Sequence, residues 1–385
     1  MFVPLVAAVL LIMLCSSGAR ADQASAFPSD VIWTKEVVTR PVAAAVASAA
    51  VATGERLFFA VETGLTSRRL RDGEDLWTNK IVATGPLATI GDRLIVPTDG
   101  EILGLDALTG STVWRLKTVA PTAPILAHDD LVFVATPERL AAFKLADGSE
   151  VWSREKLGAI EQRPAVHETW LYVPIAEGRL VALDRATGKT IWEIEVGIKP
   201  TPPLVAGDRV FIGSEAKQFC SFNVINGKQY WCQTVGAAIV GVAAVDKLRA
   251  YCVALNNLMF AFERRNGAKQ WTADLRYRPS AGPTLIGGLI TAPGKSSKLP
   301  AFNTTTGKDA AVLTLADELA APPIFIPGSE TSPAYIVALS GGLNNQWKLT
   351  LAGPPPAKLP AIDVAPLTAL PGQVVRLPAA RSPRE

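Results

Sequence analysis

Residues 179–196 read RLVALDRATGKTIWEIEV, and this stretch has the pattern of a β-hairpin. Residues 179–183 form a short apolar run, and residues 190–196 alternate between apolar and polar side chains, as a half-buried strand does. Thr187-Gly188 lies between the two runs, and glycine supplies the positive φ that tight hairpin turns need. The stretch therefore predicts two antiparallel strands joined by a tight turn.

The same pattern recurs along most of the chain. Its glycines are spaced by 37 to 40 residues, at Gly73, Gly110, Gly148, Gly188, Gly227, Gly267 and Gly307. A tryptophan stands four residues after six of them, at Trp77, Trp114, Trp152, Trp192, Trp231 and Trp271. Ala311 takes that place after the seventh glycine, and Trp33 and Trp347 bracket the series. Self-similarity at a fixed period is the signature of a repeat architecture.

A second hairpin precedes the first in each unit. Residues 87–96 turn at Gly91-Asp92, and residues 204–212 turn at Gly207-Asp208. Proline is tolerated at the start of a strand because no ladder donor is lost there. Prolines recur just before the first strand of each unit, at Pro41, Pro86, Pro124, Pro164, Pro203, Pro283 and Pro323, with Val240 standing in once.

Four short strands per unit at this period predict an all-β fold, a single eight-bladed β-propeller of four-stranded antiparallel blades over residues 30–352. A hydrophobic fraction of 49% is enough to bury the large core that such a ring needs. Residues 31–34, which contain Trp33, precede the first blade. We expect them to supply or extend the outer strand of blade eight and so to close the ring. The six repeat tryptophans are expected to be core residues wedged between blades.

The two ends of the chain differ from the repeats. Residues 2–14 are apolar and are followed by Ala19-Arg20-Ala21, so residues 1–21 are expected to be an export signal peptide, although no Lys or Arg precedes the apolar stretch. Lipidation at Cys15 is the alternative. Residues 353–385 are rich in proline and are expected to form an extended or disordered tail, with a proline-rich docking motif as the alternative.

Cys220 and Cys232 flank a turn at Asn226-Gly227 and are expected on adjacent antiparallel strands. Export implies an oxidising compartment, and cross-strand neighbours lie near the separation that a disulfide requires. A Cys220–Cys232 disulfide and two buried free thiols both remain open, because one residue of register decides between them. Cys252 is expected to be an unpaired, buried thiol.

Charge and histidine content exclude several classes of function. The net charge is +3 without a run of Lys or Arg, which argues against a nucleic-acid-binding surface. The two histidines, His128 and His167, make a multi-histidine metal site improbable and are expected in the turn slot that Gly91-Asp92 fills elsewhere. Acidic residues fall mostly in turns, where side-chain capping explains them. These are Asp92, Asp129, Asp130 and Asp208.

The repeated pattern D/N-x-x-T/N/D-G-x-x-x-W resembles the repeat of the pyrroloquinoline-quinone (PQQ)-like propeller family. One branch of that family consists of PQQ- and Ca²⁺-dependent dehydrogenases. The resemblance to that branch would imply a Glu/Asn/Asp set around the cation and a vicinal cysteine pair against the quinone. This chain has no adjacent cysteines.

The other branch consists of non-catalytic propellers of the BamB type, which act in outer-membrane assembly. Resemblance to it implies a periplasmic scaffold without a cofactor or enzymatic activity, anchored at the outer membrane if Cys15 is lipidated, with the barrel-assembly complex as its partner. In that branch an acidic, proline-terminated loop contacts the partner. The matching loop here is residues 159–164, so Ile160, Glu161 and Arg163 are expected to bind the partner, with solvated loop charges as the alternative. A quinoprotein-like enzyme or cofactor sensor is the competing function, and a sugar-binding propeller is a third.

Overall fold

The computed structural model describes residues 27–37, 51–53, 56–286, 288–326, 333–341 and 347–354. The chain divides into two compact units, Met1–Pro355 and Pro356–Glu385, and every described residue belongs to the first. The predicted signal peptide with Cys15, the Pro41 marker and the tail after Pro354 lie outside the described residues. Within those residues no helix is long and apolar enough to cross a membrane.

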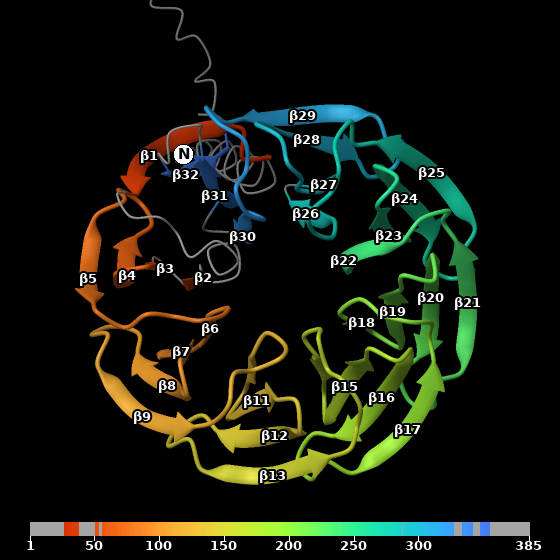
Figure 1. Cartoon of the computed structure of the whole chain (residues 1–385). Coiled ribbons are helices and arrows are strands. Elements are labelled where there is room, and N and C mark those ends of the chain that lie inside the picture. The colour runs from red at the N-terminus through yellow and green to blue at the C-terminus, as the bar shows by residue number, and fades with distance from the viewer. Residues whose placement is uncertain are drawn as a thin grey trace, which may run out of the picture. The chain divides into compact units, whose positions relative to one another are not determined.

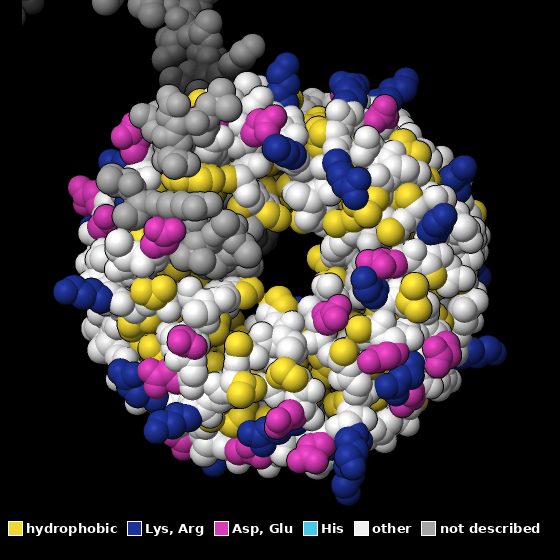
Figure 2. Space-filling model, viewed as in Figure 1, with side chains coloured by type: hydrophobic (Ala, Val, Ile, Leu, Met, Phe, Trp, Pro, Cys, Tyr) yellow, Lys and Arg dark blue, Asp and Glu magenta, His cyan; other side chains and the backbone are white. Residues whose placement is uncertain are grey.

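The described strands form eight four-stranded antiparallel sheets, arranged as blades around an open centre (Figures 1 and 2). This confirms the predicted all-β, eight-bladed propeller. In blades one to seven the strands follow chain order across the sheet, and in Figure 1 the first strand lies nearest the centre and the fourth lies at the rim. We call the four strand positions a, b, c and d from the centre outward.

The strand bounds follow the repeat. Blades one to four are β2 (Val51–Thr53), β3 (Arg56–Val61), β4 (Gly64–Arg69), β5 (Asp75–Asn79); β6 (Ala88–Ile90), β7 (Arg93–Thr98), β8 (Glu101–Asp106), β9 (Thr112–Lys117); β10 (Leu126–His128), β11 (Leu131–Ala135), β12 (Arg139–Lys144), β13 (Glu150–Glu155); and β14 (Ala165–His167), β15 (Trp170–Ile175), β16 (Arg179–Asp184), β17 (Thr190–Glu195). Blades five to seven are β18 (Leu204–Ala206), β19 (Arg209–Gly213), β20 (Gln218–Asn223), β21 (Gln229–Thr234); β22 (Ile239–Val245), β23 (Arg249–Ala254), β24 (Leu258–Glu263), β25 (Lys269–Asp274); and β26 (Thr284–Ile286), β27 (Leu289–Thr291), β28 (Lys298–Asn303), β29 (Asp309–Thr314).

Blade eight closes the ring with strands from both ends of the propeller. Its order is β30 (Ile324–Ile326), β31 (Tyr335–Gly341), β32 (Trp347–Gly353) and β1 (Asp30–Val37). The N-terminal strand β1 pairs antiparallel with β32 along its length, from Asp30 opposite Gly353 to Val37 opposite Trp347. The prediction that the segment around Trp33 supplies the outer strand of blade eight is therefore confirmed.

The repeat tryptophans dock each blade onto the next. Each indole packs against the repeat glycine of the following blade, so that a β-carbon added to Gly188 would lie 2.6 Å from Trp152. Each indole N–H also donates to a backbone carbonyl beside that glycine, as Trp152 does to Arg185 O at 2.8 Å. Trp33 donates to Leu70 O at 2.7 Å and makes the same contact from blade eight to blade one. The equivalent donors are Trp77, Trp114, Trp192, Trp231 and Trp271.

Ala311 interrupts this series for a reason that the topology supplies. A docking indole needs the c–d hairpin of the next blade, but in blade eight strands c and d come from opposite ends of the propeller and share no hairpin. Phe27, just before β1, is 5% exposed and belongs to the buried cluster of this joint together with Leu299 and Ile336. An aromatic ring from the N-terminal segment thus adds bulk where the tryptophan is missing.

Alternating strand direction gives the ring two distinct faces. The a–b turns and the c–d hairpins lie on one side, which we call the hairpin face. The b–c turns and the connections between blades lie on the other side, which we call the loop face. On the hairpin face the two turns of one blade are hydrogen-bonded to each other, as Val224 N is to Asp208 O at 3.1 Å.

The marker expected before the first strand of blade six was assigned wrongly. In blade six the residue that directly precedes the regular a-strand pairing is Ala243, because Ala244 pairs with Tyr251 as Leu204 pairs with Phe211 in blade five. Val240 lies upstream of an irregularity in β22 that shifts its register. The Pro41 marker of blade one lies outside the described residues.

The prediction that the two histidines occupy turn positions was also wrong. His128 pairs with Leu131 and His167 pairs with Trp170, so each histidine is the last residue of its a strand. The turns are Asp129-Asp130 and Glu168-Thr169. Asp129 and Glu168 have φ of 51° and 54°, the left-handed conformation that Gly91 adopts in blade two at 54°. The left-handed conformation marks the first turn residue. The sequence does not reveal this position in blades three and four, because a non-glycine residue adopts the conformation there.

Candidate functional site

The predicted partner loop, residues 159–164, lies in the connection from blade three to blade four on the loop face. Ile160 is 3% exposed and belongs to the buried core cluster between these blades. Its carbonyl accepts a hydrogen bond from the Thr122 hydroxyl at 2.7 Å. Ala176 N donates to Ala159 O at 2.8 Å, which ties the loop to the b–c turn of blade four. The structure therefore places Ile160 as the anchor of the loop and buries its side chain.

Glu161, Gln162 and Arg163 are exposed on this anchored loop. Neither charged side chain forms an ion pair or hydrogen bond with another described residue. The protein around the Arg163 guanidinium lowers its pKa by desolvation, without an acidic neighbour to raise it again. Two unpaired charges of opposite sign thus stand two residues apart on a fixed backbone.

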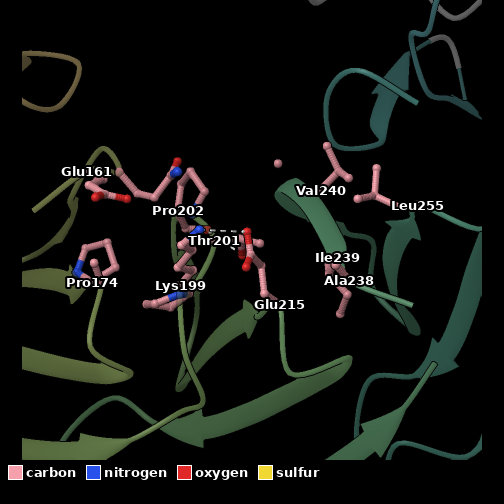
Figure 3. A pocket seen from close by; sticks show the side chains of 14 residues that line it. Glu161, Pro174, Lys199, Thr201, Pro202, Glu215, Ala238, Ile239, Val240 and Leu255 are labelled. Carbon is pink, nitrogen blue, oxygen red and sulfur yellow. Dashed lines mark hydrogen bonds and ion pairs between the residues drawn. The ribbon is translucent and has the colours of Figure 1, made fainter. Parts of the chain in front are cut away.

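A pocket of about 310 Å³ lies beside this loop and crosses from blade four to blade six. Glu161 lines it at one end, and Val240 and Leu255 line it at the other (Figure 3). Between them, Lys199 Nζ lies 3.6 Å from Glu215 Oε1. The pocket therefore offers a mixed surface, with a carboxylate at one end, an ion pair in the middle and aliphatic side chains at the other end.

Backbone hydrogen bonds join the loops around this pocket into one rigid surface. Lys199 N donates to Ala176 O at 2.8 Å, and Glu215 N donates to Ile198 O at 3.1 Å. The connection from blade four to blade five is thereby tied to the b–c turns of both blades. Such a preformed surface suits recognition without rearrangement, because little conformational entropy is lost on binding.

Exposed aliphatic residues on the inter-blade loops were missed by sequence reasoning. They are Val82, Val119 and Ile198, with 43%, 59% and 58% of their surface exposed. The signal that could have found them is an aliphatic residue shortly before the blade-entry proline, in a loop that is otherwise polar or small. Together with the pocket they give the loop face the mixture of apolar and charged groups that protein interfaces use.

The described residues do not fit a PQQ–calcium site. No group of three or more His, Cys, Asp or Glu side chains among them could hold a metal ion. The chain has no adjacent cysteines for a vicinal disulfide. Asp129, one of the turn acids, accepts a hydrogen bond from Arg185 at 2.6 Å, which holds the pKa of Asp129 below its usual value. Such acids stabilise the turns in which they lie.

Cys220 and Cys232 are directly opposite each other on β20 and β21, and their sulfurs are bonded. Cys252 is a free, buried thiol whose pKa burial raises far above its ordinary value. Neither feature lies on the loop face pocket. The cysteines therefore contribute to the packing of blades five and six.

The sequence model of one family, described as "Outer membrane protein assembly factor BamB", matches the chain three times, at residues 64–201, 137–234 and 176–321. These overlapping matches span more than half of the 385 residues. A curated relative of that name from Marinobacter adhaerens is 28% identical over 137 residues, which cover 34% of this chain and 35% of the relative. The chain spans about a third to a half of the length of the first three curated relatives that it matches.

Two solved structures share the fold. The crystal structure of BamB from Moraxella catarrhalis aligns with a TM-score of 0.68 at 18% identity, covering 84% of this chain and 99% of that one. Quinohemoprotein alcohol dehydrogenase from Comamonas testosteroni aligns with a TM-score of 0.67 at 12% identity, covering 86% of this chain and 77% of that one. At these identities the two alignments establish the propeller and leave the activity open.

Proposed function

This chain belongs to the family described as outer membrane protein assembly factor BamB, and we propose that it is a non-catalytic scaffold for outer-membrane protein assembly. The observation that carries the proposal is the span of the family match. It begins in blade one at residue 64 and ends at residue 321, in the connection between blades seven and eight. A relative from Marinobacter adhaerens bears the same description. The scaffold acts by binding proteins.

The loop face at blades three to six is the proposed docking place. Glu161 and Arg163 supply unpaired charges there, and Ile160 holds their loop in position. The neighbouring pocket provides room for a side chain of the partner. Binding at this place needs no catalytic group, because shape, a few charges and exposed aliphatic residues suffice for a protein interface.

The proposed location is the cell envelope. Residues 1–21 act as an export signal, and the mature protein works in the periplasm, or at the outer membrane if Cys15 carries a lipid. Mass spectrometry of the mature N-terminus distinguishes the two processing routes. A chain that begins at Asp22 supports cleavage after Ala21, whereas a lipid-modified Cys15 supports anchoring.

Affinity purification from envelope extracts in mild detergent tests the function. The tagged wild-type protein should co-purify outer-membrane assembly components, and Glu161→Lys/Arg163→Glu should recover about tenfold less of them. Asp130→Lys/Lys189→Glu is the matched control, because it reverses two exposed, unpaired side chains on the hairpin face and also preserves the net charge. Recovery of no assembly component by the wild-type protein would contradict the proposal.

A ligand titration separates this scaffold from a quinoprotein. PQQ with Ca²⁺ at a hundred times a dissociation constant would stabilise a binding protein by about 2.7 kcal/mol. We expect no change in the midpoint of thermal unfolding, since no group of three or more His, Cys, Asp or Glu side chains among the described residues could hold the cation. A saturable rise in that midpoint would favour a cofactor sensor or enzyme instead.

A further inference from the structure

We propose that the hairpin face of blades five and six binds a carboxylate-rich segment of a protein partner. The site is a groove of about 490 Å³, which we call the arginine groove. Its cationic lining residues are Arg209, Lys247, Arg249, Arg264 and Arg265. This site lies on the opposite face from the docking place proposed above, and it stands on its own observations.

The arginine groove concentrates positive charge. Five cationic residues line it against two acidic ones, Asp208 and Glu263, which leaves an excess of three. Asp246 does not line the groove but lies 3.8 Å from Arg249 Nη1, which reduces the local excess to two. The loop-face pocket has the opposite balance, since it is lined by one lysine and two glutamates. Folding thus gathers cations from three separate turns into one place, and a cleft of one sign attracts ligands of the other.

The nearby carboxylates neutralise two of these cations only in part. Arg209 Nε lies 3.7 Å from Asp208, and Arg249 Nη1 lies 3.8 Å from Asp246, both beyond hydrogen-bond distance. The Asp246 carboxylate is already occupied by the backbone N–H groups of Leu248 and Arg249, at 2.7 and 2.6 Å. It also accepts from the Tyr251 hydroxyl at 2.5 Å. An incoming carboxylate therefore competes only with long ion pairs, in which neither arginine donates a hydrogen bond to its carboxylate partner.

The three remaining cations have no carboxylate partner among the described residues. Arg264 donates to two backbone carbonyls, Ala206 O at 2.8 Å and Asp246 O at 3.2 Å, so its guanidinium is held in place while keeping its charge. Lys247 and Arg265 are exposed and have no hydrogen bond or ion pair within the described part of the chain. These two side chains are free to close over a bound anion.

The groove is preorganised at its base. The Arg209 side chain is only 12% exposed, and its guanidinium carbon lies 3.9 Å from the centre of the Tyr230 ring. Arg249 is 15% exposed. Planar guanidinium groups match the two oxygens of a carboxylate, and a fixed guanidinium loses little entropy when it binds one. The groove therefore favours carboxylates held in a defined position.

Exposed aliphatic side chains accompany the charge. Leu248, in the a–b turn of blade six, is 65% exposed, and Ile225, in the c–d hairpin of blade five, is 66% exposed. Leu248 itself lines the groove. An acidic peptide with interspersed apolar residues satisfies both features. A flat lipid surface fits less well, because the arginines at the base are recessed and only partly exposed.

Binding of two synthetic peptides to the purified full-length protein tests this proposal. The first is a ten-residue peptide of alternating Glu and Leu, and the second replaces each Glu with Gln. Isothermal titration should show saturable binding of the first peptide only, and NMR shifts should centre on the amides of residues 247–249 and 263–265. Lys247→Glu/Arg265→Glu should weaken binding by roughly tenfold, because two attractive charges become repulsive.

The matched control is Lys189→Glu/Lys308→Glu, which makes the same charge change at exposed hairpins of blades four and seven. It should bind the acidic peptide within about twofold of wild type, since neither lysine lines the arginine groove. If both double variants weakened peptide binding equally, the effect would come from the net charge of the protein and not from the groove, and the proposal would be overturned. Equal binding of the Gln peptide would overturn it as well. Binding to phosphatidylglycerol vesicles or to inorganic phosphate, without binding of the acidic peptide, would assign the groove to a phosphate group instead.

Discussion

Replacing Trp152 with alanine removes one of the contacts that hold neighbouring blades together. The indole is 9% exposed, packs against Gly188 and donates to Arg185 O at 2.8 Å. A tryptophan buries about 150–250 Å², which at about 25 cal/mol/Å² gives an upper value of about 4–6 kcal/mol. The carbonyl left without its donor adds about 1 kcal/mol. Because the site relaxes in part, we expect Trp152→Ala to lower the free energy of unfolding by about 3–5 kcal/mol.

Urea unfolding followed by far-ultraviolet circular dichroism measures this change, since the other tryptophans would dominate a fluorescence signal. Trp152→Phe is the control, because it keeps an aromatic ring and loses the N–H donor, and it should cost less than the alanine variant. Ala311→Trp should give no gain, because blade eight has no c–d hairpin to receive an indole. A loss below about 1 kcal/mol for Trp152→Ala would refute the docking role of the tryptophans.

Three further outcomes follow from the same structure. Trp33→Ala should cost about 3–5 kcal/mol and speed hydrogen exchange in β1, because it removes the indole that joins blade eight to blade one; unchanged exchange would contradict this closure. Reducing the Cys220–Cys232 disulfide, which closes a 12-residue separation, should lower the free energy of unfolding by about 3 kcal/mol, while Cys252 should react with Ellman's reagent only after unfolding. Burial favours neutral phenols, so their contribution to stability is complete below the ordinary tyrosine pKa of about 10 and is lost as pH rises through the raised values; ionisation near pH 10 in the native state, read at 295 nm, would contradict it. The tyrosines concerned are Tyr172, Tyr251 and Tyr277.

The repeat carries most of the information about the fold. The glycine needs positive φ in its hairpin, and the tryptophan needs that glycine in the next blade, so the two residues report both a turn and a contact between blades. Their spacing therefore predicts blade length and blade order together. The closure by Trp33 is predictable for the same reason, because an unpaired docking tryptophan before the first blade implies a partner hairpin.

Local departures from the repeat could not be predicted in the same way. In β22, Gly241 approaches Gly282 so closely that a β-carbon on Gly241 would lie 2.1 Å from Gly282 N. This close approach lies within the irregular part of β22, between Val240 and Ala244. The register shift there explains why Val240 was wrongly taken as the residue before the first strand of blade six. Likewise, Asp129 adopts positive φ without being glycine, which concealed the turn next to His128.

The candidate sites depend on contacts that no repeat encodes. Ile160 has the sequence context of an exposed loop, yet its side chain enters the core between two blades. The arginine groove combines Arg209, Lys247 and Arg265, which lie on three different turns. No long run of basic residues in the sequence predicts the groove, because folding of the ring is what brings these turns together.

Site-specific photo-crosslinking tests most directly the claim that this propeller binds an assembly partner through its loop face. A benzophenone amino acid is placed at Glu161 on the loop face and, for comparison, at Asp130 on the hairpin face; both positions are exposed. We predict that irradiation in intact cells links position 161, and not position 130, to an outer-membrane assembly protein. Crosslinks to such a protein from position 130 alone, or from neither position, would contradict the account.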